Sequence, residues 1–310
     1  MPYDKLVVVT RQTRLEELIA RFNTRGQAKF YLEHSGGDFA AYEREHDAYQ
    51  RALDRVRRTV DFGLPRQFLD RALVPTFTFG AADVVVVLGQ DGLVANTAKY
   101  AGSRPIIGVN PDPERFDGIL LPFSPAEAPE AVARVLRDAA ATRAVTLAEA
   151  QLADGQRLLA FNDLFVGARS HVSARYRLRI GDRTEPQSSS GVLVSTGAGS
   201  TGWMSSVFNM AAGVTRFVGG QCAAGPRLGW EDPRLVFAVR EPFVSRHSTA
   251  DIVAGFIEPG RELVLESLMP SGGAIFSDGV EADFLEFNAG ATSRIRAAAR
   301  HATLVVPGDP

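Results

Sequence analysis

The sequence predicts an α/β N-terminal domain of the Rossmann-like kind, with a parallel sheet, followed by a β-rich C-terminal domain. Apolar runs alternate with helical segments in the first third of the chain, and near residue 150 the pattern changes to many short alternating strands. The chain of 310 residues also exceeds the usual size of one domain. Its composition, 45% hydrophobic and 23% charged, is that of a folded globular protein.

The first domain is expected to consist of buried strands alternating with helices. Lys5–Val9 and Val84–Leu88 are short continuous apolar runs of the kind buried in parallel sheets. Apolar residues at helical spacing from Tyr49 to Val60 predict a long helix. The expected elements are strands over 5–9, 83–88 and 105–109 and helices from about 15, over 49–60 and over 93–101.

A bridging helix and a β-rich region are expected after these elements. Ser124 followed by Glu127 resembles a capping box, and we expect its helix to bridge two domains. Strands are expected over 157–161, 175–180, 192–194, 235–239, 252–257 and 263–265. A last strand over 302–306 is expected to return to the first domain. The expected division is 1–123, with 291–310 returning to it, and 124–290 for the β-rich domain.

Charge balance and cysteine content exclude several classes of function. With 34 basic and 36 acidic residues, the formal net charge is −2, which gives no positive field to hold a nucleic acid. The chain contains no Gly-Lys dipeptide and so no Walker A loop. Cys222 alone forms neither an intramolecular disulfide nor a multi-cysteine zinc site, and no apolar run is long enough to span a bilayer. We expect a cytoplasmic protein that binds neither nucleic acid nor membrane.

The strongest local motif is Gly89-Gln90-Asp91-Gly92, which lies between an apolar strand and a helix. Backbone N–H groups and the positive end of a helix stabilise phosphate oxygens at such a position. Asp91 adds a carboxylate, which a phosphate repels unless the carboxylate binds a metal or accepts a proton. The alternative is a simple turn in which Asp91 caps the helix.

Two further polar segments follow apolar strands. The stretch 195–202, which contains Gly199 and Ser200, offers hydroxyl and amide donors suited to ribose and phosphate. The acidic residue that would complete a dinucleotide-binding fingerprint is not convincingly present. Asn162 and Asp163 are able to bracket a ribose diol. The alternatives are a hairpin or crossover loop for the first segment and a simple turn for the second. The five histidines show no metal-ligand spacing.

Taken in order, these blocks resemble the NAD kinase family, and most closely its mitochondrial-type branch. The blocks are Gly-Gln-Asp-Gly at 89–92, Ile-Gly-Val-Asn-Pro-Asp-Pro-Glu-Arg at 107–115, Asn-Asp-Leu-Phe-Val-Gly at 162–167 and Ser-Ser-Gly-Val-Leu-Val-Ser-Thr-Gly-Ala-Gly-Ser at 189–200. Similar C-terminal blocks occur at 239–242, 277–279 and 286–288. The likeness therefore covers most of the chain.

The resemblance implies two domains with the active site between them, and a homodimer. The implied reaction transfers a phosphoryl group from ATP, with Mg²⁺ or Mn²⁺, to the adenosine ribose 2′-hydroxyl of NAD, giving NADP. Asp91 would be the general base that takes the hydroxyl proton. The residues implied to bind the substrate are Gly92, Asn162, Asp163, Thr201 and Ser206, and phosphate contacts are expected at Gly89, Gln90, Gly199 and Ser200.

The chain departs from the family pattern near both glycine-rich segments. Gln90 replaces a glycine, Leu93 replaces a threonine, and Trp203 follows an altered Gly-Ser-Thr stretch. If position 90 required a positive φ, Gln90 would strain its loop. Two alternatives therefore stay open: a related kinase that acts on a different nucleoside or nucleotide hydroxyl, and a non-catalytic dinucleotide-binding protein.

Overall fold

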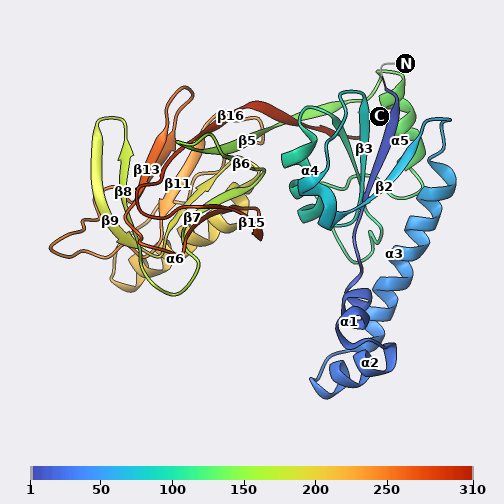
Figure 1. The fold of residues 1–310 in the computed structure, drawn as a ribbon, viewed down its shortest axis with the longest axis horizontal. Helices are drawn as coiled ribbons and strands as arrows, with labels where there is room; N and C mark the ends of the chain where they lie inside the picture. The colour runs from blue at the N-terminus through green and yellow to red at the C-terminus, as the bar shows by residue number, and fades with distance from the viewer. Residues whose placement is uncertain (1–2, 309–310) are drawn as a thin grey trace. The chain divides into compact units, whose positions relative to one another are not determined.

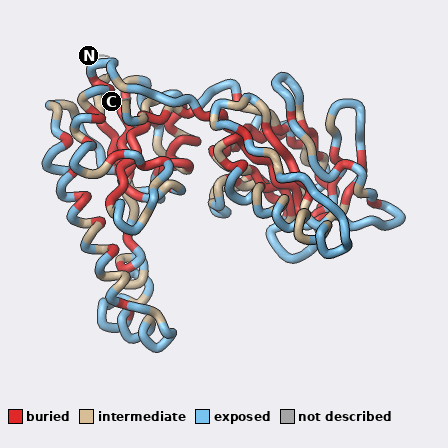
Figure 2. The backbone as a smooth tube through the Cα atoms, turned by 180° about the vertical axis from the view of Figure 1, so that it is seen from behind, coloured by how far each residue is buried: buried red, intermediate tan, exposed pale blue. Residues whose placement is uncertain are grey.

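The computed structural model describes residues 3–308 and divides into two compact units. The N-terminal unit comprises the chain up to Arg143 and again from Thr303, and the C-terminal unit is Ala144–Ala302. Each unit has its own buried core, drawn in red in Figure 2. Within residues 3–308, no helix is both long enough and apolar enough to cross a membrane.

A parallel sheet forms the centre of the N-terminal unit (Figure 1). The strand order is β2-β1-β3-β4, and Thr303 and Leu304 at the end of β16 pair with β4. β3 and the middle of β1 are fully buried, which explains their uninterrupted valine-rich runs. The bounds are β1 Lys5–Thr10, β2 Arg66–Asp70, β3 Asp83–Leu88, β4 Pro105–Val109 and β16 Thr292–Val305.

Helices cover both faces of this sheet. α3 (Phe39–Thr59) and α5 (Ala128–Leu136) share a core with the sheet face that includes Val8 and Val86. α4 (Asp91–Ala101) packs against β3 and β4, on the other side of the sheet in Figure 1, next to the short helix η1 (Arg71–Thr76). The unit is therefore a three-layer α/β structure.

β1 and β3 are neighbours in the sheet, although β2 lies between them in the sequence. The chain runs from β1 to β2 on one side and then crosses to β3 on the other side. In open α/β sheets, such a reversal creates a crevice at the carboxyl ends of the two strands, where ligands bind. Arg11, directly after β1, and Gly89, directly after β3, lie at this position.

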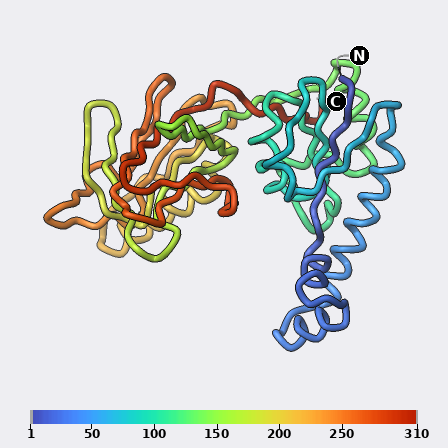
Figure 3. Tube along the Cα trace, viewed as in Figure 1, coloured from blue at the N-terminus to red at the C-terminus, as the bar shows by residue number. Residues whose placement is uncertain are grey.

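Two short helices, α1 (Arg14–Phe22) and α2 (Arg25–His34), lie together beside the first turns of α3, beyond the end of β1 (Figure 3). Thr13 begins α1 with a complete capping box: its hydroxyl accepts from Glu16 N, and its N–H donates to the Glu16 carboxylate at 2.7 Å. The sequence pattern predicted a helix near residue 15, but it did not predict this helical extension of α1 to α3.

Two antiparallel sheets enclose the core of the C-terminal unit. One has the order β12-β11-β10-β7-β14-β15; the other contains β16-β13-β8-β9, with β5 pairing with β16 and β6. α6 (Trp203–Phe217) packs on β10 and β11 through Met204. The bounds are β5 Thr142–Leu152, β6 Arg157–Ala160, β7 Asp163–Ala168, β8 Ala174–Ile180, β9 Arg183–Ser189, β10 Val192–Ser195, β11 Leu235–Val239, β12 Ala254–Ile257, β13 Leu263–Ser267, β14 Gly273–Ser277 and β15 Val280–Glu286.

The sequence pattern placed the domain boundaries at 123/124 and 290/291. In the structure, both boundaries lie later in the sequence, at 143/144 and 302/303. Val132 and Val135 of α5 pack in the core of the N-terminal unit, so this helix belongs to that unit and does not bridge two domains. The Glu127 carboxylate accepts from Ser124 N at 2.8 Å, but α5 begins only at Ala128. β16 pairs with β13 before its last residues reach β4, which explains the late second boundary.

Candidate functional site

The glycine–aspartate turn lies at the carboxyl end of β3 and begins α4. Gln90 is the N-cap of α4, with φ −121° and ψ 165°, which is extended backbone that any residue adopts. The turn therefore does not need a glycine at position 90, and the strain considered from the sequence is absent. The Gln90 side chain is exposed.

Leu93 and Gly89 pack against each other beneath this turn. Leu93 is buried, and a Cβ atom on Gly89 would lie 2.7 Å from Leu93 Cδ2. The Gly89 N–H donates to the Val109 carbonyl, at the end of β4, at 3.3 Å. Leu93 thus has a packing role in place of a hydroxyl. The phosphate contacts expected of Gly89 and Gln90 stay predictions.

The Asp91 carboxylate, at the start of α4, holds the loop that follows β4. Oδ1 accepts from Leu120 N at 2.8 Å and Oδ2 from Ile119 N at 3.3 Å. Since a carboxylate oxygen has two lone-pair directions, each oxygen is able to accept a further hydrogen bond. Next to it, a Cβ atom on Gly92 would meet no atom within 4 Å apart from its chain neighbours and the backbone of α4. The surface beside the oriented Asp91 carboxylate is therefore open.

The Asn-Pro-Asp-Pro-Glu-Arg segment shapes the loop that Asp91 holds. Asn110 Nδ2 donates to the Phe116 carbonyl at 2.8 Å, and Asn110 Oδ1 accepts from Asp112 N at 3.0 Å. A Cβ atom on Gly108 would lie only 2.0 Å from the Leu120 carbonyl oxygen, so the close approach of the loop to β4 requires glycine.

In the C-terminal unit, Asp278 organises the Asn162-Asp163 segment. Its carboxylate accepts from the consecutive N–H groups of Phe161, Asn162 and Asp163 at 2.9, 2.7 and 3.2 Å. Asp278 and Gly279 form the turn between β14 and β15, with φ of 51° and 71°. The sequence did not predict the contact of the Asp278 carboxylate with a segment more than 100 residues away.

The Asp163 carboxylate is largely buried, and its Oδ1 atom has no hydrogen-bond partner within residues 3–308. Burial raises the pKa of Asp163 to about 7; the nearby Ser195 hydroxyl lowers this pKa and the charge of Asp278 raises it further. A buried polar atom without a partner is costly in a native structure. A ligand hydroxyl is a group that would satisfy it.

The glycine-rich loop packs directly on the same segment. Thr196 N donates to the Asn162 carbonyl at 2.9 Å, and Thr196 Oγ1 donates to the Phe161 carbonyl at 2.6 Å. A Cβ atom on Gly199 would lie 2.3 Å from the Asn162 carbonyl oxygen. The structure thus brings together two motifs that the sequence separates.

Within this loop, buried and exposed residues have different roles. Gly199 and Ser200 are buried in the short helix η2 (Gly199–Thr201), and Ser200 Oγ donates to the Gly197 carbonyl at 2.7 Å. A phosphate contact by these two residues stays a prediction. Thr201, the last residue of η2, and Ser206, in the first turn of α6, are exposed, so a substrate is able to reach them.

A cavity of about 630 Å³ lies beside Trp203, with all its lining residues in the C-terminal unit. The Trp203 ring stacks on Phe165, with centroids 5.7 Å apart and planes 13° apart. The Arg240 guanidinium lies 5.4 Å from the Trp203 ring centre. Aromatic faces of this kind bind planar rings. The sequence singled out Trp203 but missed Phe165, although strand alternation places it on the same face of β7 as Asp163.

The chain was compared with protein families and with known proteins by sequence. No family model matches the chain. It is 24% identical over 315 residues to the rat protein named NAD kinase 2, mitochondrial, covering 78% of this chain and 74% of that protein. The human protein of the same name gives 24% identity over 318 residues, with 78% and 71% covered.

Two solved structures share the fold. One is yeast NADH kinase complexed with NADH, with TM-score 0.59 and 15% identity over 99% of this chain and 84% of that chain. The other is an NAD kinase from Archaeoglobus fulgidus in complex with ATP, with TM-score 0.55, 16% identity, and 97% and 93% covered. The chain thus shares the two-domain α/β and β-rich fold of these two structures, which confirms the predicted fold class. In sequence and in fold, the chain is thus similar to proteins named NAD kinase or NADH kinase.

Proposed function

We propose that this protein is an NAD kinase, which transfers the terminal phosphoryl group of ATP to the adenosine ribose 2′-hydroxyl of NAD and so forms NADP and ADP. The observation that carries the proposal is the oriented Asp91 carboxylate at the start of α4, beside the open space at Gly92. The similarity to proteins named NAD kinase and the neighbours named for ATP and NADH support it.

On the donor side, Asp91 acts as the general base. The 2′-hydroxyl oxygen attacks the terminal phosphorus, the bond from that phosphorus to the bridging oxygen of ADP breaks, and Asp91 takes the hydroxyl proton. A positioned base contributes about 10²–10⁴-fold to the rate of such a step. The bonds from Ile119 N and Leu120 N fix the carboxylate's orientation and leave it able to accept the proton.

We expect Mg²⁺ or Mn²⁺ to accompany the donor. Within residues 3–308, no group of three or more histidine, cysteine, aspartate or glutamate side chains is placed to hold a metal ion. Mg²⁺ is usually bound by one or two carboxylates together with substrate phosphates, so a site of three or more side chains is not required. Such an ion would neutralise charge on the transferred phosphoryl group.

On the acceptor side, Asn162 and Asp163 bind ribose hydroxyls of NAD. The buried Asp163 Oδ1 atom, which has no partner within residues 3–308, is the acceptor for such a hydroxyl. Thr201, at the end of η2, and Ser206, in the first turn of α6, are exposed and contact the same substrate. Trp203, stacked on Phe165, supplies a face for one of its planar rings.

The test is NADP formation by the purified protein from NAD, ATP and Mg²⁺, with Asp91→Asn measured beside it. We expect NADP from the wild type and a loss of at least about 100-fold in kcat for the variant. Thermal unfolding of both proteins shows whether Asp91→Asn keeps its fold, since Asn retains only part of the bonding to Ile119 and Leu120. No NADP from a folded, NAD-binding wild type would contradict the proposal.

A second candidate is a kinase of the same fold with another hydroxyl acceptor. The observation that favours it is the cavity at Trp203, where the aromatic lining admits planar rings other than those of NAD. ADP release with a nucleoside or a modified nucleotide, and none with NAD or NADH, would select this candidate.

We also propose a homodimer located in the cytoplasm. α6 exposes Met210, Val214 and Phe217, and exposed apolar side chains gathered on one helix are typical of association surfaces. Light scattering on the purified chain measures its mass in solution, and a monomer at micromolar concentration would contradict the dimer.

A further inference from the structure

Arg11 directly follows β1, at the carboxyl ends of β1 and β3, where ligands bind in open α/β sheets. Its side chain is 8% exposed. Nη2 donates to Glu45 Oε1 at 3.0 Å and Nη1 to the Gln12 carbonyl at 3.0 Å, but the buried Nε has no partner within residues 3–308. A guanidinium with a free N–H group has therefore been placed where ligands bind in this class of sheet.

Arg11 and Arg14 share a single carboxylate, that of Glu45. Arg14, the first residue of α1, donates through Nε to the other oxygen of Glu45. Although burial favours the neutral acid, bonds from Arg11 and Arg14 hold the pKa of Glu45 below its usual value, so Glu45 is charged at neutral pH. Two guanidinium groups thus share one carboxylate whose two oxygens are both occupied.

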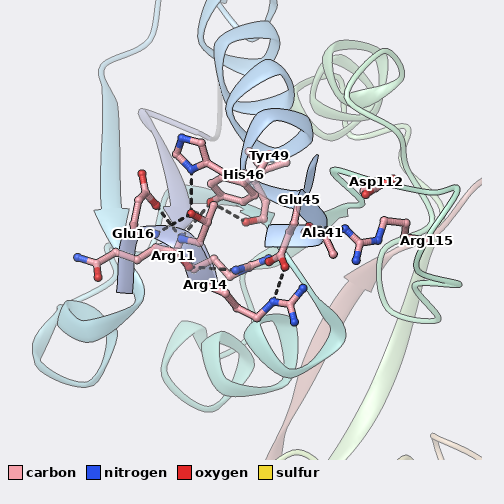
Figure 4. Close-up of polar contacts among 12 residues, drawn as sticks. Arg11, Arg14, Glu16, Ala41, Glu45, His46, Tyr49, Asp112 and Arg115 are labelled. Atoms are coloured by element: carbon pink, nitrogen blue, oxygen red, sulfur yellow. Dashed lines mark hydrogen bonds and ion pairs between the residues drawn. The ribbon is translucent and has the colours of Figure 1, made fainter. Parts of the chain in front are cut away.

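Arg115, in the loop after β4, adds a third positive charge. Its Nη1 atom lies 3.4 Å from the Ala41 carbonyl, one turn of α3 before Glu45, and it forms no ion pair with a carboxylate within residues 3–308. Figure 4 draws Arg11, Arg14 and Arg115 around these first turns of α3. The three arginines come from the carboxyl ends of β1 and β4 and from the helical extension.

The same cluster contacts both sides of the glycine–aspartate turn. Tyr49 OH accepts from Arg11 N at 2.9 Å and donates at 3.2 Å to the Leu88 carbonyl, directly before Gly89. The loop that carries Arg115 is the loop whose N–H groups donate to Asp91. Within the N-terminal unit, the arginines and Asp91 therefore share one hydrogen-bonded framework.

A purely structural role, in which the ion pairs with Glu45 hold α3 against the end of β1, would explain one of these arginines. One arginine would be enough to neutralise Glu45, whereas two are present, and the bond from Arg115 to a backbone carbonyl balances no charge. Three arginines, of which two share one carboxylate and the third forms no ion pair within residues 3–308, suit the phosphate oxygens of a polyanion at the carboxyl edge of a parallel sheet.

We propose that Arg11, Arg14 and Arg115 bind the phosphate chain of the phosphoryl donor, either a nucleoside triphosphate or an inorganic polyphosphate. This rests on the proposed function and names the donor side of that site. It also explains how a chain with three lysines, none of them in a Walker A loop, holds a polyphosphate.

The experiment measures binding of ATP, of inorganic triphosphate and of NAD to the full chain by calorimetry. Arg115→Gln is the main variant because it removes no ion pair, and Arg14→Gln is the second because Glu45 keeps Arg11. Arg137→Gln is the matched control: this arginine follows α5 in the same unit and pairs only with the exposed Glu130. Thermal unfolding confirms that each protein is folded.

We expect Kd for ATP to rise about tenfold or more in both variants, with no change in Kd for NAD and no effect of Arg137→Gln. A parallel rise for inorganic triphosphate shows that the phosphate chain itself is recognised; a rise for ATP alone selects the nucleoside triphosphate as donor. Unchanged ATP and triphosphate affinities in the folded Arg115→Gln variant would overturn the inference, as would weaker NAD binding instead. If the wild type forms no NADP but binds triphosphate through these arginines, the proposed function fails and the anion site stands.

Discussion

Replacing Asp163 by asparagine tests how the acceptor segment is built. In the wild type, burial raises the pKa of Asp163 to about 7, against about 3.9 for an aspartate in an unfolded chain. Below pH 4 both states hold the proton, so the shift costs no stability. As the pH rises from 4 to 7, only the folded state keeps the proton, and the wild type loses stability progressively.

The size of the effect follows from the difference between the two pKa values. About three pKa units at 1.36 kcal/mol each give an upper limit of about 4 kcal/mol, reached above pH 7. Asparagine cannot ionise and is close in shape to the neutral acid. We therefore expect Asp163→Asn to match the wild type near pH 4 and to exceed its stability by up to about 4 kcal/mol at pH 8.

The assay is urea unfolding at several pH values between 4 and 8. Asp154→Asn, in the exposed turn between β5 and β6, is the control because bonding from Gln156 N lowers the pKa of Asp154. That control should act with the opposite sign, since a lowered pKa stabilises the folded state as the pH rises. A stability difference between Asp163→Asn and the wild type that does not change with pH would refute the reasoning.

Three further substitutions separate packing from function. Gly92→Ala should leave the unfolding temperature unchanged or raise it, because alanine favours a helix by up to about 1 kcal/mol, while phosphoryl transfer falls because the methyl group enters the open space beside Asp91; full activity would contradict a phosphate at this point. Gly108→Ala should destabilise the protein by about 1–3 kcal/mol, seen in urea unfolding, because its Cβ atom would lie 2.0 Å from the Leu120 carbonyl oxygen. Trp203→Ala should raise KM for NAD about tenfold with little effect on stability, since the ring is partly exposed on Phe165; an unchanged KM would remove Trp203 from the acceptor site.

Buried strands were the part of the fold that the sequence predicted well. β1 and β3 are buried on both faces, so their valine runs carry a signal that does not depend on neighbours. β2 was missed because it is an edge strand in which only Leu69 is buried. Its exposed and charged residues are typical of a loop. The helical extension was missed for a related reason: α2 buries only Ala28 and shows little apolar periodicity.

For the candidate site too, the sequence predicted the local features and missed the long-range contacts. Asp91 and Asn162-Asp163 stand next to strand ends, so a strand followed by a polar motif was enough to single them out. The carboxylate of Asp278 and the pairing of Arg11 with Glu45 join residues that are far apart in sequence. Each such residue has an ordinary local interpretation, a turn or a solvated helix face, and only the fold shows the contact.

The two departures at the glycine–aspartate turn bear on whether the site has kept its chemistry. Gln90 has extended backbone and an exposed side chain, and Leu93 fills the space against Gly89, so both changes are absorbed by the packing of the N-terminal unit. Gly108 is required by that packing, because its Cβ atom would collide with the Leu120 backbone, whereas a Cβ atom on Gly89 would meet only the tip of the Leu93 side chain. Gly92 is different, since apart from its chain neighbours and the backbone of α4 no atom lies within 4 Å of the position of its missing Cβ atom. A glycine that the packing does not require, beside a carboxylate held in place by two N–H groups, is what a site for a closely approaching phosphate needs.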